Sequence, residues 1–194
     1  MKLARYPEFL LRITRSQGIV RRYFVVNGFD GALTMLGLIV GFLVSPQTSF
    51  SVIINACLGA AIALFVSGVS SAYVSESAER LRHLKQLEEA MISDLGDSAH
   101  GLAVRWVPVL TALVNGTAPL LMSVLILIPL WLSDIGVVLP LSPLIICVVI
   151  ALAEVFLLGV YLGRVAGVSW ISSGIRTLVL ALITAGLIYL CASN

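Results

Sequence analysis

Residues 27–31 read NGFDG, and from there an apolar stretch continues without a charged residue to Val44. The acidic member of this stretch, Asp30, follows the basic pair Arg21 and Arg22. In a helix that begins after this pair, a rise of ~1.5 Å per residue places Asp30 roughly 10 Å inside the apolar segment. An ionisable group at that depth is costly unless it faces a partner, a cavity or an ion. Asp30 is therefore the first candidate functional residue.

The composition is that of a membrane protein. Of the 194 residues, 59% are hydrophobic and only 11% are charged, whereas soluble domains carry about 25% charged residues. The three cysteines, Cys57, Cys147 and Cys191, all lie in apolar runs. Their spacing matches neither a metal site nor a disulfide framework, so they are expected to be small buried side chains.

Five apolar runs are long enough to cross a membrane, which takes about 20 helical residues. They are residues 24–44, 51–74, 106–132, 141–163 and 171–191. All twelve lysines and arginines can be placed on one side of such a five-span chain. Because cytoplasmic loops carry the excess of these residues, the sequence predicts an all-α integral membrane protein with its N-terminus in the cytoplasm and its C-terminus outside.

The segments between the spans complete this organisation. Residues 5–15 alternate apolar and basic side chains with helical spacing, which is typical of a helix lying in the membrane interface. After residue 75 the second span is expected to continue into the cytoplasm as a charged helix. The predicted parts are an amphipathic interfacial segment at 1–22, spans one and two at 23–75, a cytoplasmic acidic helical segment at 76–104, and spans three to five at 105–194.

Small residues recur every fourth position in span two and point to close helix packing. They are Gly59, Ala63, Ser67 and Ser71. Side chains of this size let two helix backbones approach closely in a membrane. The pattern predicts a tight bundle, either within one chain or in a dimer.

Three polar residues are expected at a similar depth in the membrane. Besides Asp30, these are Asn115 in span three and Glu154 in span four. Their oxygen atoms suit a divalent cation or a proton relay. Two alternatives involve no ion: Glu154 can pair with Arg176 of span five, and Asp30 can cap a helix or bond Asn27.

The charged helix after span two carries a second candidate site. Glu76, Glu79 and His83 share one helix face, and carboxylate and imidazole ligands one turn apart suit ferrous iron or manganese. The alternative is a solvated helix stabilised by ion pairs such as Glu76–Arg80.

The residues together resemble a known family. The NGFDG stretch, the LGL sequence at 36–38, the SAYVS sequence at 71–75 and the acidic helix that follows are similar to the vacuolar iron transporter family, in particular its short prokaryotic members. The resemblance covers the chain from about residue 20 onward. It implies a homodimer in a prokaryotic cell membrane that exports ferrous iron or manganese in exchange for protons. Asp30 matches the pathway aspartate of that family, and Glu76 and Glu79 fall where its cytoplasmic metal-binding region begins.

Two hypotheses follow from these observations. The first is a dimeric transporter with Fe²⁺ or Mn²⁺ as cargo, H⁺ as coupling ion, no permanently bound cofactor, and lipid and a second copy as partners. The second is a membrane scaffold that keeps the fold without transport, because Gly68 and Ala72 stand where the family has a methionine and a glutamate. Neither an enzyme nor a nucleic-acid-binding protein is expected, since catalytic and phosphate-loop motifs are missing.

Overall fold

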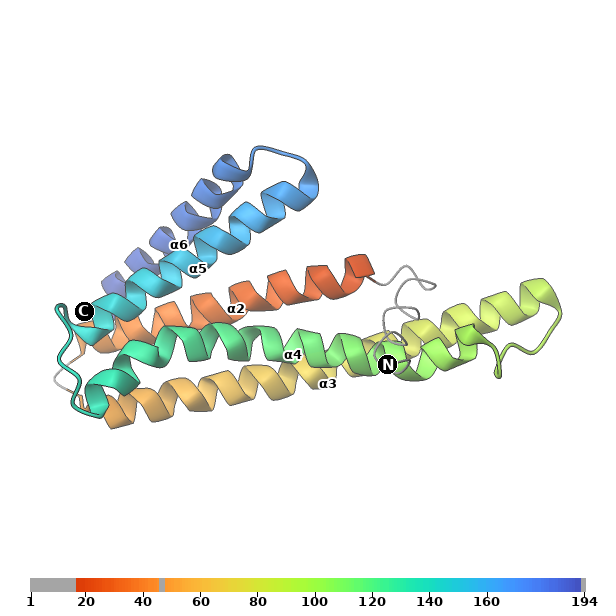
Figure 1. Ribbon diagram of the computed structural model, residues 1–194, viewed down its shortest axis with the longest axis horizontal. Helices are drawn as coiled ribbons and strands as arrows, with labels where there is room; N and C mark the ends of the chain where they lie inside the picture. Colours follow the sequence, from red (N-terminus) through yellow and green to blue (C-terminus); the bar gives the residue numbers. More distant parts are fainter. Residues whose placement is uncertain (1–16, 46–47, 193–194) are drawn as a thin grey trace. The chain divides into compact units, whose positions relative to one another are not determined.

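The computed structural model describes residues 17–45 and 48–192, and within these ranges it contains helices and no strand. The helices are α2 (Gln17–Val44), α3 (Phe50–Met91), α4 (Ala99–Asp134), α5 (Pro143–Ala166) and α6 (Trp170–Ala192) (Figure 1). All five of these described helices are long and apolar enough to cross a membrane. The prediction of an all-helical, multi-pass membrane protein is therefore confirmed. The predicted interfacial helix at 5–15 lies outside the described residues.

Helix α3 joins the second span to the charged segment without a break. It contains 42 residues, so a rise of ~1.5 Å per residue gives a length of about 63 Å, roughly twice the hydrocarbon core of a bilayer. This confirms the prediction that the helix continues beyond residue 75, and the structure places its end at Met91. Helix α2 begins at Gln17, so it includes the last residues of the segment predicted as interfacial.

The described residues divide into two compact units. One contains residues 17–24 and 65–117, and the other contains residues 25–64 and 118–192. The second unit holds the larger hydrophobic core, formed by apolar side chains of α2, α3, α4, α5 and α6. Its largest fully buried members are Met35, Leu36, Ile39, Ile53, Ile126, Leu127 and Leu130.

Small residues bring α5 and α6 together within this second unit. A Cβ added at Gly163 would lie 2.8 Å from the side chain of Ser173, and one added at Gly159 would collide with Thr177. Gly167 ends α5 with a left-handed φ of 69°, a conformation that glycine adopts without the steric cost of a Cβ atom. The two helices therefore form a tight antiparallel hairpin.

The predictions about burial are confirmed only in part. The ridge of Gly59, Ala63, Ser67 and Ser71 is exposed along α3 and is not covered by the other described helices; around Gly59, no atom of another helix lies within 4 Å of an added Cβ. Packing of this ridge in a dimer stays a prediction. Cys57 and Cys147 are buried as expected, but Cys191 is exposed. It lies at the end of α6, whose outer face no other described helix covers.

Candidate functional site

The NGFDG stretch places glycines toward the helix bundle and the carboxylate of Asp30 away from it. Gly28 and Gly31 are buried and Asp30 is exposed. A Cβ added at Gly28 would lie 3.4 Å from Leu158 Cδ1 of α5, and one added at Gly31 would lie 2.6 Å from the Cα atom of Pro119 in α4. Residues three apart share a helix face, whereas Asp30, which directly precedes Gly31, points elsewhere. The glycines therefore serve packing, and the carboxylate is left on the outer face of α2.

The Asp30 side chain makes no hydrogen bond or ion pair with another residue in the described part of the chain. It lies within the candidate span Gly18–Val44. The alternative in which Asp30 bonds Asn27 is therefore not formed. An exposed carboxylate on an apolar membrane helix needs water, an ion or a second protein surface beside it.

Glu154 of α5 has a different environment. It is half-buried, and neither of its carboxylate oxygens has a hydrogen-bond partner among the described residues. Arg176 of α6 is exposed, and the predicted ion pair between the two side chains is not formed. Glu154 is therefore a carboxyl group inside an apolar helix pair without a structural partner.

Asp30 and Glu154 lie at a similar level along their helices. Within the second unit, α2 and α5 run in opposite directions (Figure 1), and Gly28 faces Leu158. Asp30 follows Gly28 by two residues, and Glu154 precedes Leu158 by four. At ~1.5 Å per residue, the two carboxyl-bearing positions differ in level by only about 3 Å.

Asn115 is part of the other unit, and there it holds two helices together. It is only 4% exposed, and its Nδ2 atom donates a hydrogen bond of 2.8 Å to the carbonyl oxygen of Gly68 in α3. A Cβ added at Gly68 would lie 3.0 Å from the Cα atom of Gly116. Glycine at position 68 thus permits the close approach of α3 to α4, which explains why no larger side chain stands there.

We expect Asn115→Ala to lower the free energy of unfolding by about 1–2 kcal/mol, because the bond between the helices is lost and a buried carbonyl group loses a donor. Thr117→Val is the matched control, since the Thr117 hydroxyl donates only to carbonyl oxygens of its own helix. Unfolding in mixed detergent micelles measures both variants. If Asn115→Ala and Thr117→Val have the same free energy of unfolding, the hydrogen bond from Asn115 to Gly68 contributes nothing to stability.

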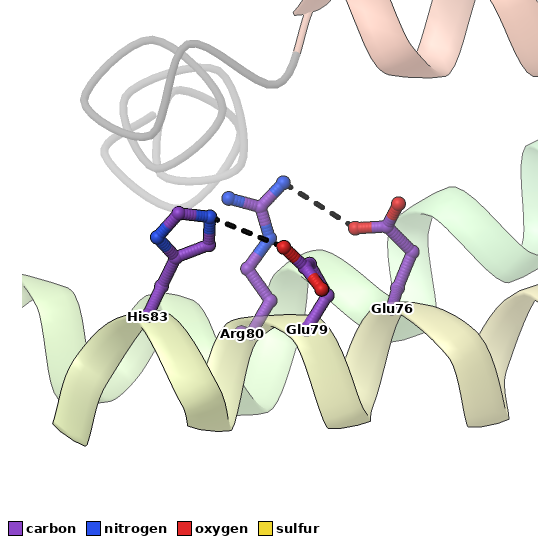
Figure 2. A network of polar contacts seen from close by, with 4 residues as sticks. All are labelled: Glu76, Glu79, Arg80 and His83. Atoms are coloured by element: carbon purple, nitrogen blue, oxygen red, sulfur yellow. Dashed lines mark hydrogen bonds and ion pairs between the residues drawn. The ribbon is translucent and has the colours of Figure 1, made fainter. Parts of the chain in front are cut away.

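Two side-chain contacts lie along the face of α3 that carries Glu76, Glu79 and His83. Arg80 Nη2 lies 3.3 Å from Glu76 Oε2, and His83 Nε2 lies 3.3 Å from Glu79 Oε1 (Figure 2). The predicted Glu76–Arg80 pair is therefore present. Within the described ranges, no group of three or more histidine, cysteine, aspartate or glutamate side chains is arranged to hold a metal ion. A metal at Glu76 must compete with the guanidinium group of Arg80.

Arg80, predicted only as a possible ion-pair partner of Glu76, has the more unusual environment. It is 9% exposed, and its Nε atom has no hydrogen-bond partner in the described part of the chain. The spacing of four residues between Glu76 and Arg80 predicts their ion pair. The burial of Arg80 cannot be predicted in this way, because it depends on residues of another helix.

The sequence is similar to that of an uncharacterized archaeal protein. No family model matches the sequence. The chain is 31% identical over 173 residues to the uncharacterized protein MJ0645 of Methanocaldococcus jannaschii, and the match covers 87% of this chain and 86% of that protein. The similarity therefore covers most of the chain rather than one motif. The chain belongs to the same family as this archaeal protein.

Proposed function

We propose that this protein transports a divalent metal ion, Fe²⁺ or Mn²⁺, out of the cytoplasm in exchange for protons. The observation that carries the proposal is Asp30, an exposed carboxylate without a partner among the described residues, on a helix apolar enough to cross a membrane. Ionisable groups in membrane helices typically line ion pathways, because the membrane interior otherwise makes them costly. Carboxylate oxygens are also the ligands that hard divalent cations prefer.

The working unit in this proposal is a homodimer. The outer face of α2 presents Asp30, and the outer face of α3 presents the small-residue ridge of Gly59, Ala63, Ser67 and Ser71. Small residues at this spacing support close packing of membrane helices. A second copy would cover these faces and turn the exposed carboxylates into the lining of a pathway.

The remaining polar residues take supporting roles. Glu154, whose oxygens lack partners in the described structure, would accept protons or metal near the level of Asp30. Glu76, Glu79 and His83 would collect metal at the cytoplasmic mouth, with the N-terminus placed inside by the distribution of basic residues. Asn115 would hold α3 against α4 through its bond to Gly68. The resemblance to vacuolar iron transporters supports this assignment of the cargo.

The test is uptake of Fe²⁺ and Mn²⁺ into proteoliposomes, with and without a pH gradient. We expect Asp30→Asn to reduce flux at least ~10-fold, which corresponds to a loss of about 1.4 kcal/mol or more of differential binding. Asp134→Asn is the matched control, because it makes the same change at an exposed residue at the end of α4.

Flux that depends on Asp30 and responds to the gradient supports metal–proton exchange. Absence of flux for both metals from a folded wild-type protein contradicts the proposal and favours the non-transporting scaffold. Equal flux from Asp30→Asn and wild type contradicts the assigned role of Asp30.

A further inference from the structure

A cavity of about 180 Å³ lies where the charged part of α3 faces the first turns of α4. Both helix segments belong to the same compact unit. The polar residues that line the cavity are Arg80, His83 and His100, and its apolar side includes Leu84 and Leu87. The two histidines are the only ones in the sequence. Among the described residues, no carboxylate lines the cavity.

Arg80 gives this cavity a donor that the described part of the fold does not satisfy. The side chain is 10% exposed, and its Nη2 atom contacts Glu76 at 3.3 Å. Its Nε atom is buried and has no hydrogen-bond partner among the described residues. Buried N–H groups in proteins are nearly always paired, so a ligand with acceptor oxygens in the cavity would supply the missing partner.

The charges around the cavity favour an anion over a cation. A guanidinium group and two imidazoles contribute to the lining, and α4 begins at Ala99, which places the positive end of its helix dipole beside His100. The nearest acidic groups on α3 are already engaged, Glu76 with Arg80 and Glu79 with His83 (Figure 2). A metal ion in this cavity would be opposed by the buried charge of Arg80.

We propose that this cavity binds a phosphate group. Arginine donates charge-assisted hydrogen bonds to phosphate oxygens, and protonated histidine adds further donors. A volume of about 180 Å³ exceeds the ~30 Å³ that a water molecule occupies in the liquid several-fold, which leaves room for a phosphate. This site uses residues that the transport pathway does not require, apart from His83.

Two sources of phosphate fit this position. The apolar part of α3 ends at Val74, and Arg80 follows six residues later, about 9 Å further along the helix. Lipid headgroups extend roughly 5–7 Å beyond the hydrocarbon core on each side, so Arg80 lies near their level. The phosphate can thus come from an anionic lipid or from a free phosphate compound, and the experiment separates the two.

The test uses the full-length protein in a maltoside detergent. One arm titrates inorganic phosphate by calorimetry, with chloride as the control anion. The other arm titrates mixed micelles that contain phosphatidic acid, with phosphatidylcholine micelles as the control. Binding in the first arm alone indicates a free phosphate ligand, whereas binding only to phosphatidic acid indicates a lipid headgroup.

The variants Arg80→Gln and His100→Gln are expected to weaken phosphate binding about 10-fold or more, the effect of losing one charge-assisted hydrogen bond. Arg82→Gln removes the same charge at an exposed position two residues further along α3 and outside the cavity lining, and it should change affinity less than ~2-fold. Because Arg80→Gln also leaves Glu76 without its counter-charge, the exposed residue His100 provides a variant that does not disturb that pair.

The variant Glu76→Gln is expected to change phosphate binding and Mn²⁺ binding in opposite directions. It releases Arg80 from its ion pair, so it should strengthen phosphate binding, whereas a metal-collecting role for Glu76 requires the same change to weaken Mn²⁺ binding. Absence of metal flux would not contradict phosphate binding in this cavity, so each proposal can be rejected without the other. Three results would overturn the phosphate site: no binding in either arm, equal binding by all variants, or Mn²⁺ binding that depends on both histidines without phosphate binding.

Discussion

Replacing Gly31 by alanine is expected to lower the free energy of unfolding by about 3 kcal/mol, at the upper end of the usual cost of overpacking. The added Cβ atom would lie 2.6 Å from the Cα atom and 2.7 Å from the carbonyl oxygen of Pro119. Both atoms belong to the backbone of α4, so no side-chain rotation relieves the collision. The helices α2 and α4 would have to move apart, which opens the packing around Met35 and Leu36.

Gly41→Ala is the matched control for this experiment. It makes the same substitution in the same helix, and no atom lies within 4 Å of the added Cβ. Alanine is intrinsically the better helix former by up to ~1 kcal/mol, so Gly41→Ala should leave stability unchanged or raise it slightly. Unfolding by sodium dodecyl sulfate in mixed micelles gives both values. A Gly31→Ala protein as stable as the Gly41→Ala protein would show that α2 and α4 do not approach closely at this point.

Replacing Glu154 by leucine is expected to have the opposite effect on stability. Both carboxylate oxygens are buried without a hydrogen-bond partner in the described structure, and an unsatisfied buried polar group costs about 1–3 kcal/mol. Leucine has a similar size and no polar atom, so the free energy of unfolding should rise by an amount in this range. Under the proposed function, metal flux in proteoliposomes should fall at the same time.

Glu154→Gln separates the two effects, because it removes the negative charge but keeps a polar group without a partner. It should gain little stability, and it should lose flux if the carboxylate carries protons or metal. A loss of stability in Glu154→Leu would contradict the prediction, since it would mean that the carboxyl group has a stabilising partner in the membrane. A stabilised variant with undiminished flux would remove Glu154 from the transport proposal.

The Gly31 and Glu154 variants distinguish residues that pack the helices together from residues that are candidates for function. Within NGFDG, Gly28 and Gly31 are explained by the approach of α5 and α4, and only Asp30 is left without a structural role. Glu154 is likewise unexplained by packing. Residues that cost stability without structural benefit are the best candidates for function, since activity commonly trades against stability.

The sequence by itself determined the helical membrane fold, the number of candidate spans and the continuation of α3 beyond residue 75. These features depend on apolar length and helical periodicity, which are properties of neighbouring residues. The pair of Glu76 and Arg80 was also predictable, because residues four apart on one helix are adjacent whatever surrounds them.

The tertiary structure alone decided which faces of these helices are covered. The small-residue ridge of α3, predicted to pack within one chain or in a dimer, is exposed among the described helices, whereas Gly68, outside that ridge, packs against Gly116. Asn115 bonds a residue 47 positions away, and the cavity beside Arg80 needs the first turns of α4 as its second wall. Periodicity shows that a helix has faces, but the partner of each face is chosen by contacts between segments far apart in the chain, and no local pattern encodes those contacts.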